Sequence, residues 1–388
     1  MSLKRIMDIE VLRGIAVLGV VLHHMRDNLF LGTASWLEAL DPRAQFWWGV
    51  DLFFAISGFV IARSLIPTLQ GCTTRQAFWQ QARSFWIRRV FRLLPAAWLW
   101  LAVILLAALL FNRSGAFGSL HANVQATLAG LLHYANFRFA DALFNYEYGA
   151  SFVYWSLALE EQFYLLFPLL ILLFRQRLAW ALAVLVLAQL FIERGSLLMA
   201  VRTDALALGV LLAIWSAKPS YQRLEPTFLR RGWLGLALLV LASGVLGLLA
   251  AKRLLPEYRI GAIAVICGVL VWVASYNRDY LFPRGKLKDL LTWVGSRSYG
   301  IYLIHVPVYF FLREVCFRLQ EAGGPNPYAY PWLLLGLALG LIVVLSELSY
   351  RLVELPMRNR GSRLVKRLES RRQGEENAAA IARQPMPE

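Results

Sequence analysis

Arg13 and His24, in the N-terminal apolar segment, are the residues whose types and spacing first suggest chemistry. They are eleven residues apart, which on an α-helix is three turns plus about 20°, so both face the same way about 16 Å apart. The chain between them is apolar except for His23. A guanidinium and an imidazole on one face of a membrane-type helix are costly to bury, so such groups usually serve a site. We therefore expect a functional site along this face.

Four further places carry polar groups within or beside apolar segments. They hold Asp51 with Ser57 and Gly58; Arg88, Arg89 and Arg92; the adjacent acids Glu160 and Glu161; and His305. Each also has a purely structural interpretation. Asp51 can cap the start of a helix, and Gly58 can allow two helices to pack closely. The three arginines can anchor the protein at the cytoplasmic membrane surface. His305 can be a hydrogen-bonded residue of the packed interior. A structural role is harder to assign to Glu160 and Glu161, because two carboxylates in one span need protons, partners or water.

The composition indicates a membrane protein. Of 388 residues, 59% are hydrophobic and 16% are charged, and the mean hydropathy is +0.53. Apolar stretches of about 18 to 22 residues are typical of transmembrane helices. We place such spans at 10–29, 46–66, 93–112, 154–174, 178–192, 203–217, 233–251, 259–276, 293–312 and 331–352. The predicted fold is an all-α polytopic membrane protein with about ten transmembrane helices, in one domain covering 1–356.

The basic residues decide how this protein is oriented. The net charge of +16 would suit nucleic acid, but the basic residues cluster in short loops beside apolar segments and in the C-terminal tail. This placement follows the positive-inside rule and puts both termini in the cytoplasm. We expect membrane lipids as surroundings and no nucleic acid as partner. The tail, residues 357–388, is basic and then polar, and is expected to be disordered.

Two segments differ from the spans. Residues 75–92 have an apolar side and a basic side, which predicts an amphipathic helix at the cytoplasmic interface, with Pro95 in the first turn of the next span. Residues 126–143 are moderately apolar but include His133 and Arg138. Counting this segment as a span would invert everything downstream, so we predict a re-entrant or interfacial helix.

Seven motifs resemble, in order, those of the membrane-bound acyltransferase 3 family. They are LRGIAVLGVVLHH with Arg13 and His24, GVDLFFAISGFVIA, RRVFRLLP, YWSLALEEQFYLLFPLL, TDALALGVLLA, SYGIYLIHVPV and the ELP that ends at Pro356. They extend from about residue 8 to 360. Val60 and Leu355 are small departures, because the family often has Leu and Arg at these places.

The resemblance implies an enzyme of the bacterial inner (cytoplasmic) membrane. Such enzymes transfer an acyl group, often acetyl, from a cytoplasmic donor such as acetyl-CoA to a hydroxyl. Their acceptors are mostly sugars of surface polysaccharides, lipopolysaccharide or glycolipids. Some members carry a fused SGNH esterase-like domain outside the membrane, and this chain resembles the stand-alone O-acyltransferase type without one.

Acyl transfer to an alcohol needs a base, stabilisation of the oxyanion and contacts to both substrates. We predict His24 as the base, because a neutral imidazole accepts a proton at pH 7. Asp51, Glu160 and Glu161 are each candidates for the acid that orients it. The alternative is that His24 itself carries the acyl group as an acyl-imidazole. Cys72, Cys267 and Cys316 lack metal-site and disulfide spacing, and no metal is expected.

Substrate contacts are expected at both ends of the Arg13–His24 face. The donor contacts are Arg13, Arg88, Arg89, Arg92, Ser57 and Gly58, and the acceptor contacts are Tyr154, Trp155, Glu161 and His305. Guanidinium groups suit the phosphates of coenzyme A, a small residue such as Gly58 permits close approach, and aromatic side chains suit sugars.

The competing function is a proton-coupled transporter or flippase of a glycolipid or saccharide. Intramembrane Arg, His and Glu also relay protons, so these residues alone do not distinguish the two classes. The sequence shows no inverted repeat of the kind found in many transporters, which favours the enzyme. It carries no signal for the oligomeric state.

Overall fold

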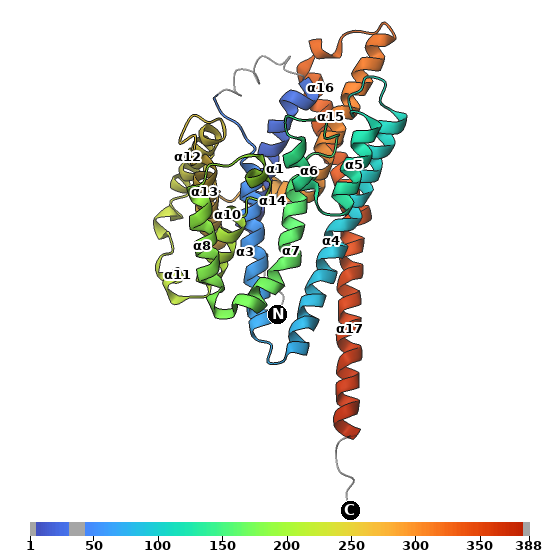
Figure 1. Ribbon diagram of the computed structural model, residues 1–388. Helices are drawn as coiled ribbons and strands as arrows, with labels where there is room; N and C mark the ends of the chain where they lie inside the picture. Colours follow the sequence, from blue (N-terminus) through green and yellow to red (C-terminus); the bar gives the residue numbers. More distant parts are fainter. Residues whose placement is uncertain (1–4, 31–42, 383–388) are drawn as a thin grey trace, which may run out of the picture.

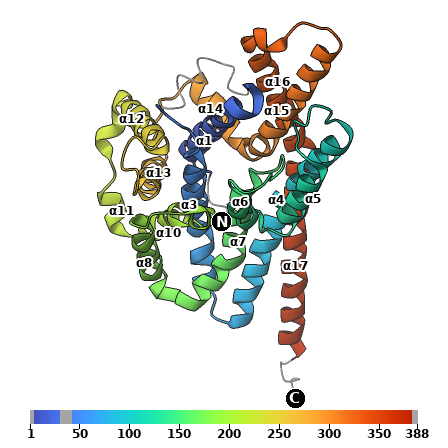
Figure 2. The same cartoon turned by 45° about the horizontal axis from the view of Figure 1, so that its top comes forward.

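The computed structural model describes residues 5–30 and 43–382, and every regular element in that part is helical. Three helices lie in the middle of the bundle (Figure 1): α1 (Met7–Met25), α3 (Gly49–Gln70) and α7 (Tyr154–Phe174). One flank holds α8 (Leu178–Leu190), α10 (Asp204–Ser216), α12 (Gly232–Ala250) and α13 (Arg259–Ser275). The other flank holds α4 (Arg75–Leu110), α5 (Leu120–Leu131), α15 (Ser298–Glu321) and α16 (Pro331–Ser349), as the tilted view in Figure 2 also shows.

Shorter helices connect these elements. They are α6 (Ala135–Ala142), α9 (Ser196–Ala200), α11 (Pro219–Arg223) and α14 (Lys286–Ser296), and the long α17 (Leu355–Ala382) follows α16. Five brief π or 3₁₀ turns complete the described part: Arg26–Phe30, Arg175–Arg177, Thr227–Arg230, Pro327–Ala329 and Tyr350–Glu354.

Each of the ten predicted spans overlaps one of these helices, namely α1, α3, α4, α7, α8, α10, α12, α13, α15 and α16. By length and composition, seven helical stretches in the described residues can cross a membrane: 49–70, 75–110, 154–190, 196–216, 233–250, 298–321 and 331–371. Helix α13 is apolar but shorter. The all-α polytopic fold is confirmed, and the number of crossings stays a prediction.

Helix α4 corrects one prediction. The basic segment 75–92 is not a separate interfacial helix, because α4 runs without interruption from Arg75 to Leu110 with Pro95 inside it. Contacts just before the proline support this continuity. Gly361 of α17 packs directly on Phe91, and the indole of Trp86 donates to the carbonyl oxygen of Tyr164 in α7, 3.1 Å away. Tertiary packing thus holds a helix that proline alone would end.

The segment 126–143 is also not a single helix. It is divided between α5 and α6, and the break lies at His133, whose φ of 58° is left-handed. His133 Nδ1 lies 2.5 Å from a carboxylate oxygen of Glu161 in α7. This contact between distant segments fixes the break, and the apolar pattern of the segment does not reveal it.

The tail is helical where disorder is expected. Helix α17 continues to Ala382 and extends past the bundle (Figure 1), and residues 383–388 lie outside the described part. Arginine, leucine, lysine, glutamate and alanine are abundant in this segment and favour helix. Packing of Gly361 on α4 adds tertiary support to its first turns.

Helices α3 and α10 pack closely against each other. A β-carbon on Gly58 would overlap the carbonyl oxygen of Leu206. A β-carbon on Gly209 would overlap the carbonyl oxygen of Ala55. Paired small residues that let two helix backbones touch are typical of membrane helix interfaces. Gly58 therefore serves this interface.

Substituting Gly58 by alanine is expected to destabilise the protein by about 2 kcal/mol, because the added carbon forces two backbones apart. Thermal unfolding of the detergent-purified protein, followed by size-exclusion chromatography, measures the effect. Gly336→Ala is the matched control, since apart from its own helix backbone no heavy atom of the described residues lies within 4 Å of the added carbon. Equal midpoints for the two variants would contradict this account of the interface.

Candidate active site

Two histidines from distant parts of the chain form a pair inside the bundle. His24 lies in the last turn of α1 and His305 lies in α15. His24 Nδ1 and His305 Nε2 are 2.9 Å apart, and the stacked rings have centroids 5.2 Å apart. His305 has no exposed surface. The structure thus joins one residue expected in catalysis with one expected in acceptor binding.

The contacts of His305 indicate which nitrogen of each ring carries the proton. Its Nδ1 lies 3.3 Å from the carbonyl oxygen of Ile301, and because a carbonyl only accepts, this Nδ1 is the donor. Nε2 of His305 is then an acceptor, so Nδ1 of His24 donates to it. Nε2 of His24 keeps its lone pair. A neutral imidazole in this tautomer can accept a proton or an acyl group.

A cavity, which we call the arginine cavity, approaches the pair from one side. Tyr302 lines it, and the Tyr302 ring centroid lies 5.7 Å from that of His305. Its other lining residues are Arg13, Val50, Phe53, Phe54, Ser57, Val60, Ile61, Arg89, Arg92, Leu93, Ser156, Leu157, Glu160, Tyr164, Ser298 and Tyr299. Arg88 and Gly58 are absent from this wall, and Arg88 is exposed.

Three guanidinium groups therefore share one cavity. Arg89 and Arg92 form no ion pair with any acid in the described part of the chain, and Arg89 lies over the ring of Tyr164 at 5.2 Å. Arg13 has a distant partner in Glu10, at 3.5 Å. Arginines without close acid partners suit a multiply charged anion such as a phosphate.

Glu160 belongs to the wall of the arginine cavity. Its carboxylate accepts hydrogen bonds from the hydroxyls of Ser57 and Tyr164. Tyr164 follows Glu160 by four residues, which is one helical turn. Glu160 is one of the three acids considered as partners of His24, and its hydrogen bonds go to two hydroxyls of this wall instead.

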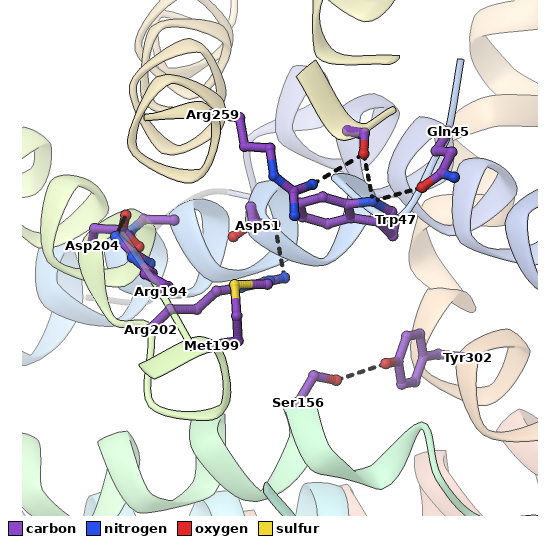
Figure 3. A network of polar contacts seen from close by, with 12 residues as sticks. Gln45, Trp47, Asp51, Ser156, Arg194, Met199, Arg202, Asp204, Arg259 and Tyr302 are labelled. Atoms are coloured by element: carbon purple, nitrogen blue, oxygen red, sulfur yellow. Dashed lines mark hydrogen bonds and ion pairs between the residues drawn. The ribbon is translucent and has the colours of Figure 1, made fainter. Parts of the chain in front are cut away.

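Asp51 lies in a separate buried network (Figure 3). Its carboxylate accepts from Arg202 at 3.0 Å, and both side chains are almost fully buried. The Arg202 guanidinium also lies near the faces of two indole rings, 5.1 Å from the Trp47 centroid and 5.0 Å from the Trp155 centroid. A second buried pair, Arg194 with Asp204 at 2.6 Å, lies nearby. The carboxylate of Asp51 is therefore paired with an arginine that lies 151 residues later in the chain.

Comparison with known proteins identifies the family. A family model described as an acyltransferase domain matches residues 6–350. The chain belongs to this acyltransferase family. It is 30% identical over 394 residues to a putative peptidoglycan O-acetyltransferase (YrhL) of Bacillus subtilis, and 28% identical over 399 residues to a peptidoglycan O-acetyltransferase (OatA) of Listeria monocytogenes.

These matches cover 94% and 93% of this acyltransferase chain but only 56% and 57% of the two relatives. A putative O-acetyltransferase of Staphylococcus aureus is 27% identical over 395 residues, covering 93% of this chain and 58% of the relative. The chain thus spans somewhat more than half the length of these curated relatives. No solved structure matches significantly.

The two residues expected to stack on a sugar make other contacts. Tyr154 is buried, and its hydroxyl donates to the carbonyl oxygen of Ala97 at 2.9 Å. Trp155 is half-buried, with one neighbour in Arg202 and another in Phe139, whose ring is stacked on it at 5.7 Å. Neither side chain lines the arginine cavity.

Glu161 pairs with His133 at the break between α5 and α6. The bond to Glu161 raises the pKa of His133 above its ordinary value, and partial burial opposes this rise. The pair is therefore best formed when His133 is protonated. Glu161, like Asp51 and Glu160, makes its hydrogen bond away from His24.

Three groups of the site, Tyr164, Tyr302 and Arg202, were not predicted from the sequence. Tyr164 could have been found from its spacing of one turn after Glu160, and Tyr302 from its spacing of three residues before His305. Arg202 stands directly before the TDALALG motif, in a polar stretch that follows an apolar segment. The sequence around Arg202 contains nothing that indicates its pairing with Asp51.

Proposed function

We propose that this acyltransferase is a membrane O-acetyltransferase that moves acetyl from acetyl-CoA to a hydroxyl of a cell-surface sugar. The observation that carries the proposal is the His24–His305 pair beside the arginine cavity. The pair leaves one nitrogen of His24 free for chemistry, and the cavity offers guanidinium groups to the phosphates of the donor.

In this mechanism His24 acts as the general base. Its Nε2 takes the proton of the acceptor hydroxyl while the oxygen bonds to the acetyl carbon. The carbon–sulfur bond breaks, and the coenzyme A thiolate leaves and takes up the proton. His305, held by the Ile301 carbonyl, keeps His24 in the required tautomer. In the alternative route acetyl passes first to Nε2 of His24 and then to the hydroxyl.

Arg89→Ala is expected to raise the KM for acetyl-CoA about tenfold, because it removes one guanidinium contact to phosphate of about 1.5 kcal/mol. Steady-state kinetics of the purified protein, with free thiol as the readout, measure this change. Arg88→Ala is the control, since Arg88 is exposed and does not line the cavity. Unchanged KM for Arg89→Ala would remove the phosphate role.

We further propose an inner-membrane location with both termini cytoplasmic, a membrane domain at 1–356 and a tail at 357–388. Donor entry from the cytoplasm follows, because Arg89 and Arg92 lie on the basic side. The acceptor is a sugar of a surface polysaccharide, lipopolysaccharide or glycolipid. Peptidoglycan joins these candidates, because two relatives are named for it.

Labelled acetyl-CoA, supplied to inside-out vesicles that contain the protein, tests the function. Acceptor-dependent release of free coenzyme A together with labelled O-acetyl ester is the expected result. Movement of saccharide without loss of the thioester would instead indicate the transporter.

A further inference from the structure

A second cavity lies beside the His24–His305 pair and shares no lining residue with the arginine cavity. Phe152 lines it and meets the His24 ring edge-on, with centroids 5.3 Å apart. Asn28 also lines it and donates its amide to the backbone oxygen of His24 at 2.8 Å. Neither residue lines the arginine cavity. Neighbours of the histidine pair therefore line two separate cavities: Tyr302 lines the arginine cavity, and Phe152 and Asn28 line the second one.

The walls of this second cavity are largely aromatic, and we call it the aromatic cavity. It is lined by Phe117, Phe139, Tyr146, Tyr148, Phe152 and Phe310, among others. Phe144 also lines it, with 98% of its surface exposed and a left-handed φ of 67°. Bulky residues rarely adopt this conformation, which persists only where the surroundings impose it. An aromatic ring that is exposed at the edge of a cavity is available to stack on a ligand.

Buried polar side chains hold the aromatic walls in place. Arg138 is buried, donates to the carbonyl oxygen of Tyr148 at 3.0 Å, and lies over the Tyr148 ring at 4.5 Å. Asn123, also buried, donates to the carbonyl oxygen of Phe117 at 2.7 Å and accepts from the backbone of Ala150 at 3.0 Å. These contacts fix the loop that carries Phe144, so the cavity is preorganised for a ligand.

The charge of the aromatic cavity is opposite to that of the arginine cavity. Glu147 is the one charged residue among its described lining residues. The carboxylate of Glu147 accepts from the backbone of Ser119 at 3.1 Å and is otherwise exposed. A lone carboxylate accepts hydrogen bonds from hydroxyl groups and repels anions. Aromatic rings present flat apolar faces to the C–H face of a sugar ring.

We infer that the aromatic cavity is the acceptor subsite and that it takes an uncharged sugar. The inference rests on the proposed function, because it assigns the sugar to one side of His24 and the thioester donor to the other. A sugar stacked on these rings would present hydroxyls to Glu147 and to the wall formed by Phe152 and Asn28, which contact His24. The carboxylate of Glu147 disfavours anionic sugars, since none of the described lining residues is a lysine or an arginine.

Calorimetric titration of the full chain in lipid nanodiscs tests the inference with two defined probes. Tetra-N-acetylchitotetraose is the uncharged probe and tetragalacturonate is the anionic probe. The wild-type protein is expected to bind the uncharged probe about tenfold more tightly than the anionic one. Phe144→Ala is expected to weaken binding of the uncharged probe about fivefold, since one aromatic face is lost.

Tyr330→Ala is the matched control, because Tyr330 is also a largely exposed aromatic residue but does not line the cavity. If Phe144→Ala does not fold, Glu147→Gln provides the second test, and it is expected to reduce the difference between the two probes. The inference is overturned if the wild type binds neither probe or binds both equally. It is also overturned if Phe144→Ala binds like the control, or if Glu147→Gln, tested in its place, keeps the wild-type difference.

A parallel titration with acetyl-CoA separates this inference from the proposed function. Saturable binding of acetyl-CoA without any probe preference would leave the acetyltransferase in place and remove the acceptor subsite. Absence of acetyl-CoA binding, with the probe preference intact, would instead remove the donor on which the proposed function depends.

Discussion

His24→Ala is expected to lower acetyl transfer by about 10³-fold or more, with the amount and thermal midpoint of the purified protein close to wild type. The reason is that the substitution removes the one nitrogen that the His24–His305 pair leaves free for chemistry. Release of free thiol from acetyl-CoA and formation of O-acetyl ester are the two measurements. His121→Ala is the control, because His121 is exposed and bonds to Gln125 in α5.

The companion variant His305→Ala tests the tautomer argument. Without His305, Nδ1 of His24 loses its acceptor and the ring is free to place its proton on either nitrogen. We expect kcat to fall about 10²-fold with an unchanged KM for acetyl-CoA, since His305 does not line the arginine cavity. A rise in KM alone would assign His305 to donor binding. Wild-type rates of acetyl transfer in both variants would show that the histidine pair takes no part in the mechanism.

The histidine pair illustrates how far the sequence predicts this site. Arg13 and His24 are recognisable because their spacing is local and fits one helix face. The partner of His24 is not, because His305 lies 281 residues later in the chain and α1 and α15 must pack together before the two rings meet. Three acids were reasonable candidates on chemical grounds, yet each has a closer partner in Ser57 and Tyr164, His133 or Arg202.

The same distinction applies to the fold. Apolar runs are local, so the positions of the helices could be predicted from hydropathy. Continuity through Pro95 and the break at His133 could not, because each depends on contacts from another helix: Gly361 on Phe91 in the first case, Glu161 on His133 in the second. The helical tail was missed because a polar composition was taken as disorder although most of its residues favour helix.

Asp51→Ala is expected to destabilise the protein by about 3–5 kcal/mol, because it leaves the buried Arg202 guanidinium without its counter-ion. The expected observation is loss of the monodisperse peak in size-exclusion chromatography and a sharply lower thermal midpoint. Glu321→Ala is the control. It breaks the exposed pair with Arg113, 2.8 Å apart, and such pairs contribute at most about 1 kcal/mol.

The double variant Asp51→Leu with Arg202→Met decides what Asp51 contributes. Removing both charges leaves no buried ion unpaired, and apolar replacement of a buried pair is often neutral for stability. The indole faces of Trp47 and Trp155 can pack against methionine as they do against the guanidinium. Recovery of both folding and acetyl transfer would show that Asp51 only compensates Arg202. Recovery of folding without acetyl transfer would show that the ion pair also contributes to activity, through Trp155, whose ring stacks on Phe139 in the wall of the aromatic cavity.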